Sequence, residues 1–185
     1  SLFDFGGWVF FSQLVRSLYS AIDRSFIGRM MTATFLGYYH IAHRFGNEIP
    51  NELKSVVNQV MFPLFSIQQN NIEKVKQNFL LLLKINLICI FPVLSIIFFM
   101  SDYLVILFLG EGWQLAISSL KILILVALIQ SLISSAFPLF KGLGYPHYET
   151  KILLTNVLFT LIPIYPLVLN YGIEGAAWAL LIGQF

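Results

Sequence analysis

The sequence predicts an all-α, polytopic membrane helix bundle with about six transmembrane helices. Of its 185 residues, 58% are hydrophobic and only 11% are charged, and the mean hydropathy is +0.81. A typical soluble domain is about 25% charged, so this chain has too little charge to solvate a globular surface. Several windows also contain the roughly 20 mostly apolar residues that a helix needs to cross the ~30 Å hydrocarbon layer. These observations exclude an ordinary soluble protein and a disordered chain.

Six segments meet this description in order along the chain. The expected spans cover residues 3–22, 38–66, 79–100, 115–140, 151–169 and 173–185, the last of them cut by the end of the chain. A polar break is expected over 23–37 and a hydrophilic loop over 68–77. The apolar part of segment 101–113 is too short to cross a bilayer, which predicts a short helix lying against the membrane surface.

The chain begins at Ser1 without a methionine and ends within an apolar run, so residues 1–185 are expected to be a piece of a longer protein. The single cysteine, Cys89, excludes an intramolecular disulfide and, with no suitable cluster of ligands, indicates no metal site. The net charge of +2 does not point to a nucleic acid. Neither a nucleophile triad nor paired carboxylates are apparent, and the sequence therefore predicts neither an enzyme nor a cofactor.

Lysines predict the orientation of the expected spans. Loop 67–78 contains Lys74 and Lys76, with Lys84 near the start of the next span, and loop 141–150 contains Lys141, with Lys151 directly after it. Loops 101–113 and 170–172 contain no Lys or Arg. Cytoplasmic loops carry the excess of these residues, so the first two loops are expected in the cytoplasm and the other two outside. Arg24 and Arg29 then lie in a segment expected outside, which suggests that Asp23 or a ligand holds them.

The second expected span is divided into a polar and an apolar face. Asn47, Asn51, Lys54 and Asn58 recur at intervals of four, three and four residues, which places them on one stripe of a helix. Apolar side chains, including Val56, lie on the opposite face. Such a helix is expected to line water on its polar side. The alternative is an amphipathic helix lying flat on the membrane surface.

Cations occur on several of the expected helices. Arg16 is a deep cation without an apparent partner, and Arg44, Lys84 and Lys121 lie in or near other spans. Together they predict a cavity of positive potential that suits an anionic, phosphate-bearing cargo. For Lys84 and Lys121 the alternative is that they extend to the lipid headgroups. The candidate cavity residues are Arg16, Asp23, Arg24, Arg44, Asn47, Asn51, Lys54, Asn58, Lys84 and Lys121.

Five motifs in register with this hydropathy pattern resemble a known family. They lie at Ile22–Gly28, Leu36–Ala42, Val60–Ser66, Leu109–Trp113 and Tyr171–Ala177. The chain resembles, over essentially its whole length, the Wzx-type polysaccharide exporters of the multidrug/oligosaccharidyl-lipid/polysaccharide superfamily. Within this group it is most similar to the colanic acid and teichuronic acid type.

The resemblance implies a two-lobed, multi-pass protein of the bacterial inner membrane, of which this chain is the C-terminal lobe. It also implies alternating-access flipping of an undecaprenyl-diphosphate-linked glycan unit, for lipopolysaccharide or exopolysaccharide at the cell surface. The implied partners are the bilayer and the lipid-linked glycan. The resemblance also allows two further partners: a coupling ion, H⁺ or Na⁺, and a glycan polymerase.

Two other functions stay open at this point. An ion-coupled exporter of drugs or small metabolites would have the same architecture but would place acidic residues deep in the spans, and Glu48 and Glu52 allow this reading. A membrane scaffold that recruits glycan-assembly enzymes would transport nothing. A flipping assay with a labelled lipid-linked sugar separates the three functions.

Overall fold

A computed structural model describes residues 2–185, with the side chains of residues 5–52 and 54–185. It confirms the all-α prediction, because helices make up nearly all of the described chain and no strand occurs in it. The elements are α1 (Leu2–Met30), α2 (Ala33–His43), a π-helical turn (Arg44–Glu48), α3 (Ile49–Ile67), α4 (Ile72–Leu109), a 3-10 turn (Glu111–Trp113), α5 (Leu115–Ser134), α6 (Ala136–Gly142) and α7 (Pro146–Ile182).

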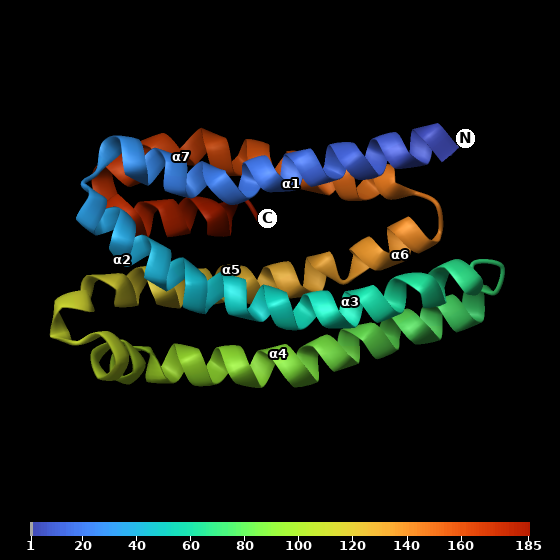
Figure 1. Cartoon of the computed structure of the whole chain (residues 1–185), viewed down its shortest axis with the longest axis horizontal. Coiled ribbons are helices and arrows are strands. Elements are labelled where there is room, and N and C mark those ends of the chain that lie inside the picture. The colour runs from blue at the N-terminus through green and yellow to red at the C-terminus, as the bar shows by residue number, and fades with distance from the viewer. Residues whose placement is uncertain (1) are drawn as a thin grey trace.

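The helices form two layers of elongated rods. Figure 1 shows α1 beside α7 in one layer, and the continuous rod of α2 and α3 with α4, α5 and α6 in the other. Helix α5 contacts α2 and α4 in its own layer and α7 in the opposite layer. It is therefore the central helix of the bundle.

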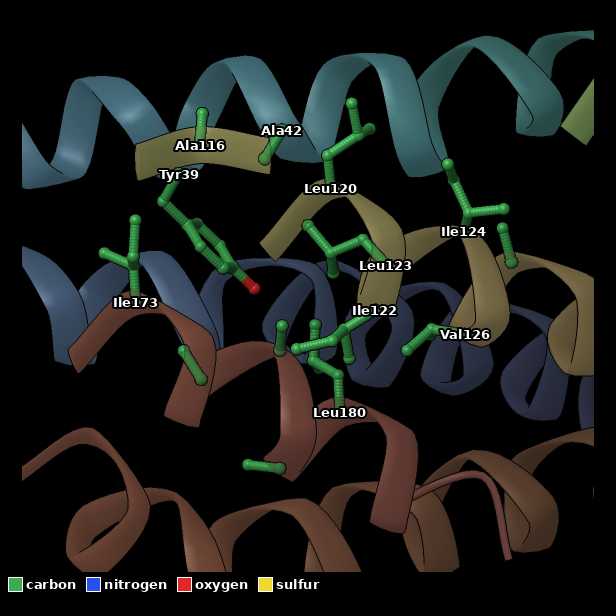
Figure 2. Packing of buried hydrophobic residues seen from close by; sticks show 14 of the residues in the cluster. Tyr39, Ala42, Ala116, Leu120, Ile122, Leu123, Ile124, Val126, Ile173 and Leu180 are labelled. Atoms are coloured by element: carbon green, nitrogen blue, oxygen red, sulfur yellow. The ribbon is translucent and has the colours of Figure 1, made fainter. Parts of the chain in front are cut away.

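The main core lies around α5. Ala116 and Leu123 of α5 are completely buried, as are Tyr39 and Ala42 of α2 (Figure 2). From α7, Leu180 enters the same cluster. Small residues allow helix backbones to approach closely, which is the main source of helix association where lipid replaces water.

Prolines interrupt two of the rods at defined positions. Pro50 has no N–H to donate to the carbonyl of Gly46, and the backbone there widens into the π-helical turn that joins α2 to α3. Pro138 stands four residues after Ser134, where its ring would meet the Ser134 carbonyl, and α5 ends at that residue. These interruptions bend the two rods beside the space between the layers.

Helix α7 is folded back on itself. Gly172 has a φ of 60° and a ψ of −132°, a conformation that reverses the chain and that L side chains rarely adopt. A Cβ atom on Gly175 would overlap the carbonyl of Leu167, and one on Gly183 would overlap the hydroxyl of Thr160. The two arms of α7 are thus in close contact and form an antiparallel hairpin.

The polar break expected over 23–37 is wrong in extent. Helix α1 continues to Met30, and only Met31 and Thr32 separate it from α2. The helix continues because Asp23 is satisfied by side-chain contacts and Ile27 is completely buried in the core. The polar residues at 23–30 are therefore part of a continuous helix.

The interfacial helix expected within 101–113 is also wrong. Helix α4 runs without interruption to Leu109 and ends at Gly110, whose φ is 89°. Its last turns are held by packing of the buried Val105 and by an ion pair of 2.8 Å between Asp102 and Lys121 Nζ. At its start, Asn71 accepts a hydrogen bond of 3.1 Å from the backbone of Lys74, so the hydrophilic loop is shorter than expected.

Three helices in the described part of the chain are long and apolar enough to cross a membrane. They are Ile72–Leu109, Leu115–Gly142, which joins α5 to α6, and Pro146–Ile182, which contains the reversal at Gly172. Large apolar side chains such as Phe99 and Ile88 are exposed on the outer surface. The number of about six spans and the two-lobed architecture stay predictions.

The turns gather at two opposite ends of the bundle. Figure 1 shows the turns at 31–32, 110–114 and 172 at one end, and those at 68–71 and 143–145 at the other. This grouping matches the alternation that the lysine distribution predicts. Which end faces the cytoplasm stays a prediction.

We expect Gly175→Ala to destabilise the full-length protein. The new methyl group would overlap backbone atoms of Leu167, which cannot move aside as a flexible side chain can. The expected loss is about 1–3 kcal/mol. Gly37→Ala is the matched control, because a Cβ atom on this helical glycine meets nothing within 4 Å. Thermal unfolding in detergent should show a lower midpoint for Gly175→Ala only. Equal midpoints for the two variants would contradict the close packing of the hairpin.

Candidate functional site

A polar cavity of about 890 Å³ lies between the two layers of the bundle. Helix α1 forms one wall, and α2, α3, α5 and α6 form the other. Its polar and charged lining residues are Gln13, Arg16, Ser17, Tyr19, Ser20, Asp23, Arg24, His43, Asn47, Glu48, Asn51, Lys54, Ser55, Asn58, Gln59, Gln130, Ser134 and Lys141. A cavity so rich in charges and amides holds water or a polar ligand.

The polar stripe on α3 and the preceding turn faces this cavity. Asn51 donates a hydrogen bond of 3.0 Å to Asn47, and Asn47 lies 3.3 Å from the ring of His43. Asn58 continues the same face one turn beyond Lys54. Val56 points the other way and is 64% exposed. The polar stripe therefore lines the cavity between the layers, and the apolar face of the helix lies outside.

A buried carboxylate joins two cations of the cavity wall. Glu149 lies in the first turn of α7 and is 0% exposed. One of its oxygens pairs with the guanidinium of Arg16, and the other lies 3.1 Å from Lys141 Nζ. Arg16 also lies over the ring of Phe137, 5.3 Å from its centre. The expectation that Arg16 is unaccompanied is therefore wrong, because its partner is 133 residues away in the sequence.

A second carboxylate is buried at the far end of the cavity. Asp23 is 1% exposed and accepts hydrogen bonds from the Tyr39 hydroxyl at 2.7 Å and from the Arg24 backbone N–H at 2.8 Å. His43 Nε2 lies 3.8 Å from Asp23 Oδ2. The cluster ties α1 to α2 and leaves Asp23 with little capacity for another ligand.

The arginines of the expected polar break are not held by the carboxylate of Asp23. The guanidinium of Arg24 donates to the backbone carbonyl of Ser20 at 2.6 Å and lies 3.8 Å from Glu48. Arg29 is exposed beyond the cavity. Of the two expected holders, Asp23 is therefore excluded for these side chains, and a ligand stays a prediction.

The cavity contains more positive than negative charge. Its wall carries four cationic side chains, of which Arg24 faces Glu48 and two pair with Glu149. Lys54 is only 4% exposed, and no acidic side chain in the described part of the chain lies within ion-pair distance of it. A buried ammonium group without a partner favours an anion nearby.

The structure brings seven of the ten predicted cavity residues together and places three elsewhere. Those around the cavity are Arg16, Asp23, Arg24, Asn47, Asn51, Lys54 and Asn58. Of the others, Arg44 and Lys84 are exposed on the outer surface, and Lys121 pairs with Asp102 near the end of α4. These three therefore do not line this cavity. The role of the seven toward a substrate stays a prediction.

Sequence reasoning missed Glu149, Lys141 and Gln130 as members of the site. Lys141 and Glu149 flank a short turn, which made them look like loop residues. One sequence pattern could have indicated this pair: a basic residue in the last turn of one helix and an acidic residue in the first turn of the next, each of which suits the dipole of its helix. The amide oxygens of Gln130 and Asn58 are buried without a hydrogen-bond partner among the described residues.

No cluster of three His, Cys, Asp or Glu side chains that could hold a metal ion occurs in the described residues. The chemistry that this arrangement supports is binding. It offers cations for an anionic group and amides for hydroxyl groups, at a place where two helix layers meet.

Comparison with known proteins places the chain among proteins of polysaccharide biosynthesis. A family model described as "Polysaccharide biosynthesis protein" matches residues 1–118. The chain is 30% identical to the lipopolysaccharide biosynthesis protein WzxC of Escherichia coli (strain K12) over 127 residues, which are 69% of this chain and 26% of that protein.

Two further relatives extend this picture. The teichuronic acid biosynthesis protein TuaB of Bacillus subtilis (strain 168) is 29% identical over 132 residues, 71% of this chain and 27% of that protein. A protein described as an uncharacterized membrane protein in the cps region of Klebsiella pneumoniae is 21% identical over 183 residues, 99% of this chain and 37% of its own length. The chain thus spans between a quarter and two fifths of these relatives. No solved structure matches.

We expect Tyr39→Phe to destabilise the full-length protein, because it removes a donor from the buried carboxylate of Asp23. The expected cost is about 1–3 kcal/mol in unfolding free energy. Tyr38→Phe is the matched control, because Tyr38 packs edge-on against Trp113 and its hydroxyl has no hydrogen bond among the described residues. Unfolding in mixed detergent micelles measures both. A Tyr39→Phe variant as stable as Tyr38→Phe would refute the anchoring role.

Proposed function

The chain belongs to the polysaccharide biosynthesis protein family, and from this premise we propose that it forms one lobe of a lipid-linked glycan flippase. The cargo is an undecaprenyl-diphosphate-linked oligosaccharide or repeat unit. The protein moves it from the cytoplasmic to the outer leaflet of the bacterial inner membrane by alternating access. The product serves cell-surface polysaccharide biosynthesis.

The observation that carries this proposal is the cationic, amide-lined cavity between the layers. A diphosphate group needs positive partners away from bulk water, and Arg16, Lys54 and Lys141 lie around one space of about 890 Å³. A glycan needs hydrogen-bonding groups along its path, which Asn51 and Asn58 provide on the same wall. Both parts of the proposed cargo therefore have complementary groups in one cavity.

The surface of the bundle supports a location within lipid. Helices α4 and α7 have the length and composition to cross a membrane. Helix α3 packs along α4, so α3 crosses the same layer in this proposal and does not lie flat on the surface. The breaks at Pro50 and Pro138 adjoin the cavity, where helix halves that tilt separately can open one end and close the other.

Two other functions receive less support. An exporter of cationic drugs needs accessible acids in its cavity. Glu48 lines the cavity and is 41% exposed, but it lies 3.8 Å from the guanidinium of Arg24. Asp23 is bound by Tyr39, and Glu149 is enclosed by two cations. A scaffold that only recruits enzymes has no use for an internal polar cavity. A coupling ion, H⁺ or Na⁺, and a contact with a glycan polymerase stay predictions within this proposal.

We expect Arg16→Ala and Lys54→Ala to reduce flipping of a labelled polyprenyl-diphosphate-linked sugar by at least about tenfold, since each removes a charged contact to the diphosphate. The assay uses the full-length protein in proteoliposomes and measures the label that becomes accessible on the other side. Arg44→Ala is the matched control, because Arg44 is exposed outside the cavity.

All three variants should insert into the membrane in equal amounts. Unchanged flipping by both Arg16→Ala and Lys54→Ala would refute the cavity as the cargo site. Equal loss in Arg44→Ala would show that the effect does not depend on the cavity.

A further inference from the structure

Resting on the proposed function, we propose that Glu149 is an internal counter-ion that occupies Arg16 and Lys141 until the phosphate of the cargo displaces it. The cluster draws on three helices: Arg16 from α1, Lys141 from α6 and Glu149 from α7. Its two cations line the cavity, whereas Glu149 lies behind them and is not part of the cavity wall. The arrangement thus presents a phosphate site in which a carboxylate of the protein stands in for the anion.

The exposure of the three side chains shows where an exchange can take place. Arg16 is 42% exposed and Lys141 is 21% exposed, whereas Glu149 is 0% exposed. Each cation therefore has one side turned to the carboxylate and another side open to the cavity. An incoming anion reaches the cations first and competes with Glu149 for their donors without touching the carboxylate.

The charges around the cluster explain why a counter-ion is needed in the empty cavity. Lys54 lines the same space, and no described acidic side chain lies within ion-pair distance of it. Without Glu149, three cations would face one another in a partly enclosed space, which costs free energy unless an anion is present. Glu149 lowers that cost while the site is empty, and it also limits how tightly the cargo is held.

A purely structural role for Glu149 explains only part of the geometry. Lys141 in the last turn of α6 and Glu149 in the first turn of α7 each suit the dipole of their own helix. The helix dipole does not account for the position of Arg16, because Arg16 comes from the middle of α1. It reaches Glu149 and stacks over Phe137, with the rest of its guanidinium turned toward the cavity.

The exchange also gives the cargo a means of loosening the bundle. The pair of Arg16 with Glu149 joins α1 to α7, and the pair with Lys141 joins α7 to α6. A phosphate that takes over both cations breaks these links at the end of the cavity near the turn at 143–145. Displacement of Glu149 by the phosphate then both binds the cargo and breaks the contacts between helices at this end of the cavity.

The test measures binding of a short-chain polyprenyl diphosphate, and of inorganic pyrophosphate alone, to the full-length protein in lipid nanodiscs. Glu149→Gln keeps the size of the side chain but removes its charge, so we expect both probes to bind about tenfold more tightly. In an Arg16→Gln background the same substitution should increase affinity much less, since one of the two released cations is absent. Glu111→Gln, at an exposed acid in the 3-10 turn, is the matched control and should leave affinity unchanged.

Three outcomes decide between this inference, a structural role and the proposed function itself. If folded Glu149→Gln binds both probes with unchanged or weaker affinity while wild-type protein binds them, the counter-ion role is wrong and the proposed function stands. If Glu149→Gln does not fold, Glu149→Asp decides, because its shorter side chain holds the cations less closely; a folded Glu149→Asp that binds no tighter than wild type overturns the inference. If wild-type protein neither binds the polyprenyl diphosphate nor flips its sugar-linked form, the proposed function fails.

Discussion

The ion-pair cluster of Arg16, Glu149 and Lys141 is the contact on which the arrangement around the cavity depends. A buried ionised group costs free energy unless it finds a partner within the protein. The cluster meets this requirement with side chains from three helices and fixes α1 across the ends of α6 and α7. Arg16 and Lys141 thereby come to face the shared cavity.

Breaks in the helices shape that space. The π-helical turn before Pro50 and the end of α5 before Pro138 both lie beside the cavity, on the wall opposite α1. At the other end, the buried contact of Tyr39 with Asp23 holds α1 against α2. Polar contacts thus join α1 to its neighbours at two places beside the cavity, and interrupted helices border the cavity between them.

Membership of the polysaccharide biosynthesis family and the chemistry of the cavity lead to the same proposal by different routes. The family match rests on residues 1–118 and includes α1 to α4. Lys141 and Glu149 lie beyond that region, yet they complete the site with Arg16. Glu149, outside the region of the family match, is thus the ion-pair partner of Arg16, which lies within it.

The sequence by itself determined that the chain is a helical membrane protein, where most of its rods lie and which face of α3 is polar. These properties depend on composition and on the periodicity of neighbouring residues, which are local. Only the tertiary structure decided that Arg16 meets Glu149 and that Arg44 lies outside the cavity. It also decided that α1 continues into the expected polar break and that residues 101–109 extend α4 and do not form a separate helix. Helical periodicity gives the face on which a side chain lies, but the helix that packs against that face depends on contacts between residues far apart in the chain.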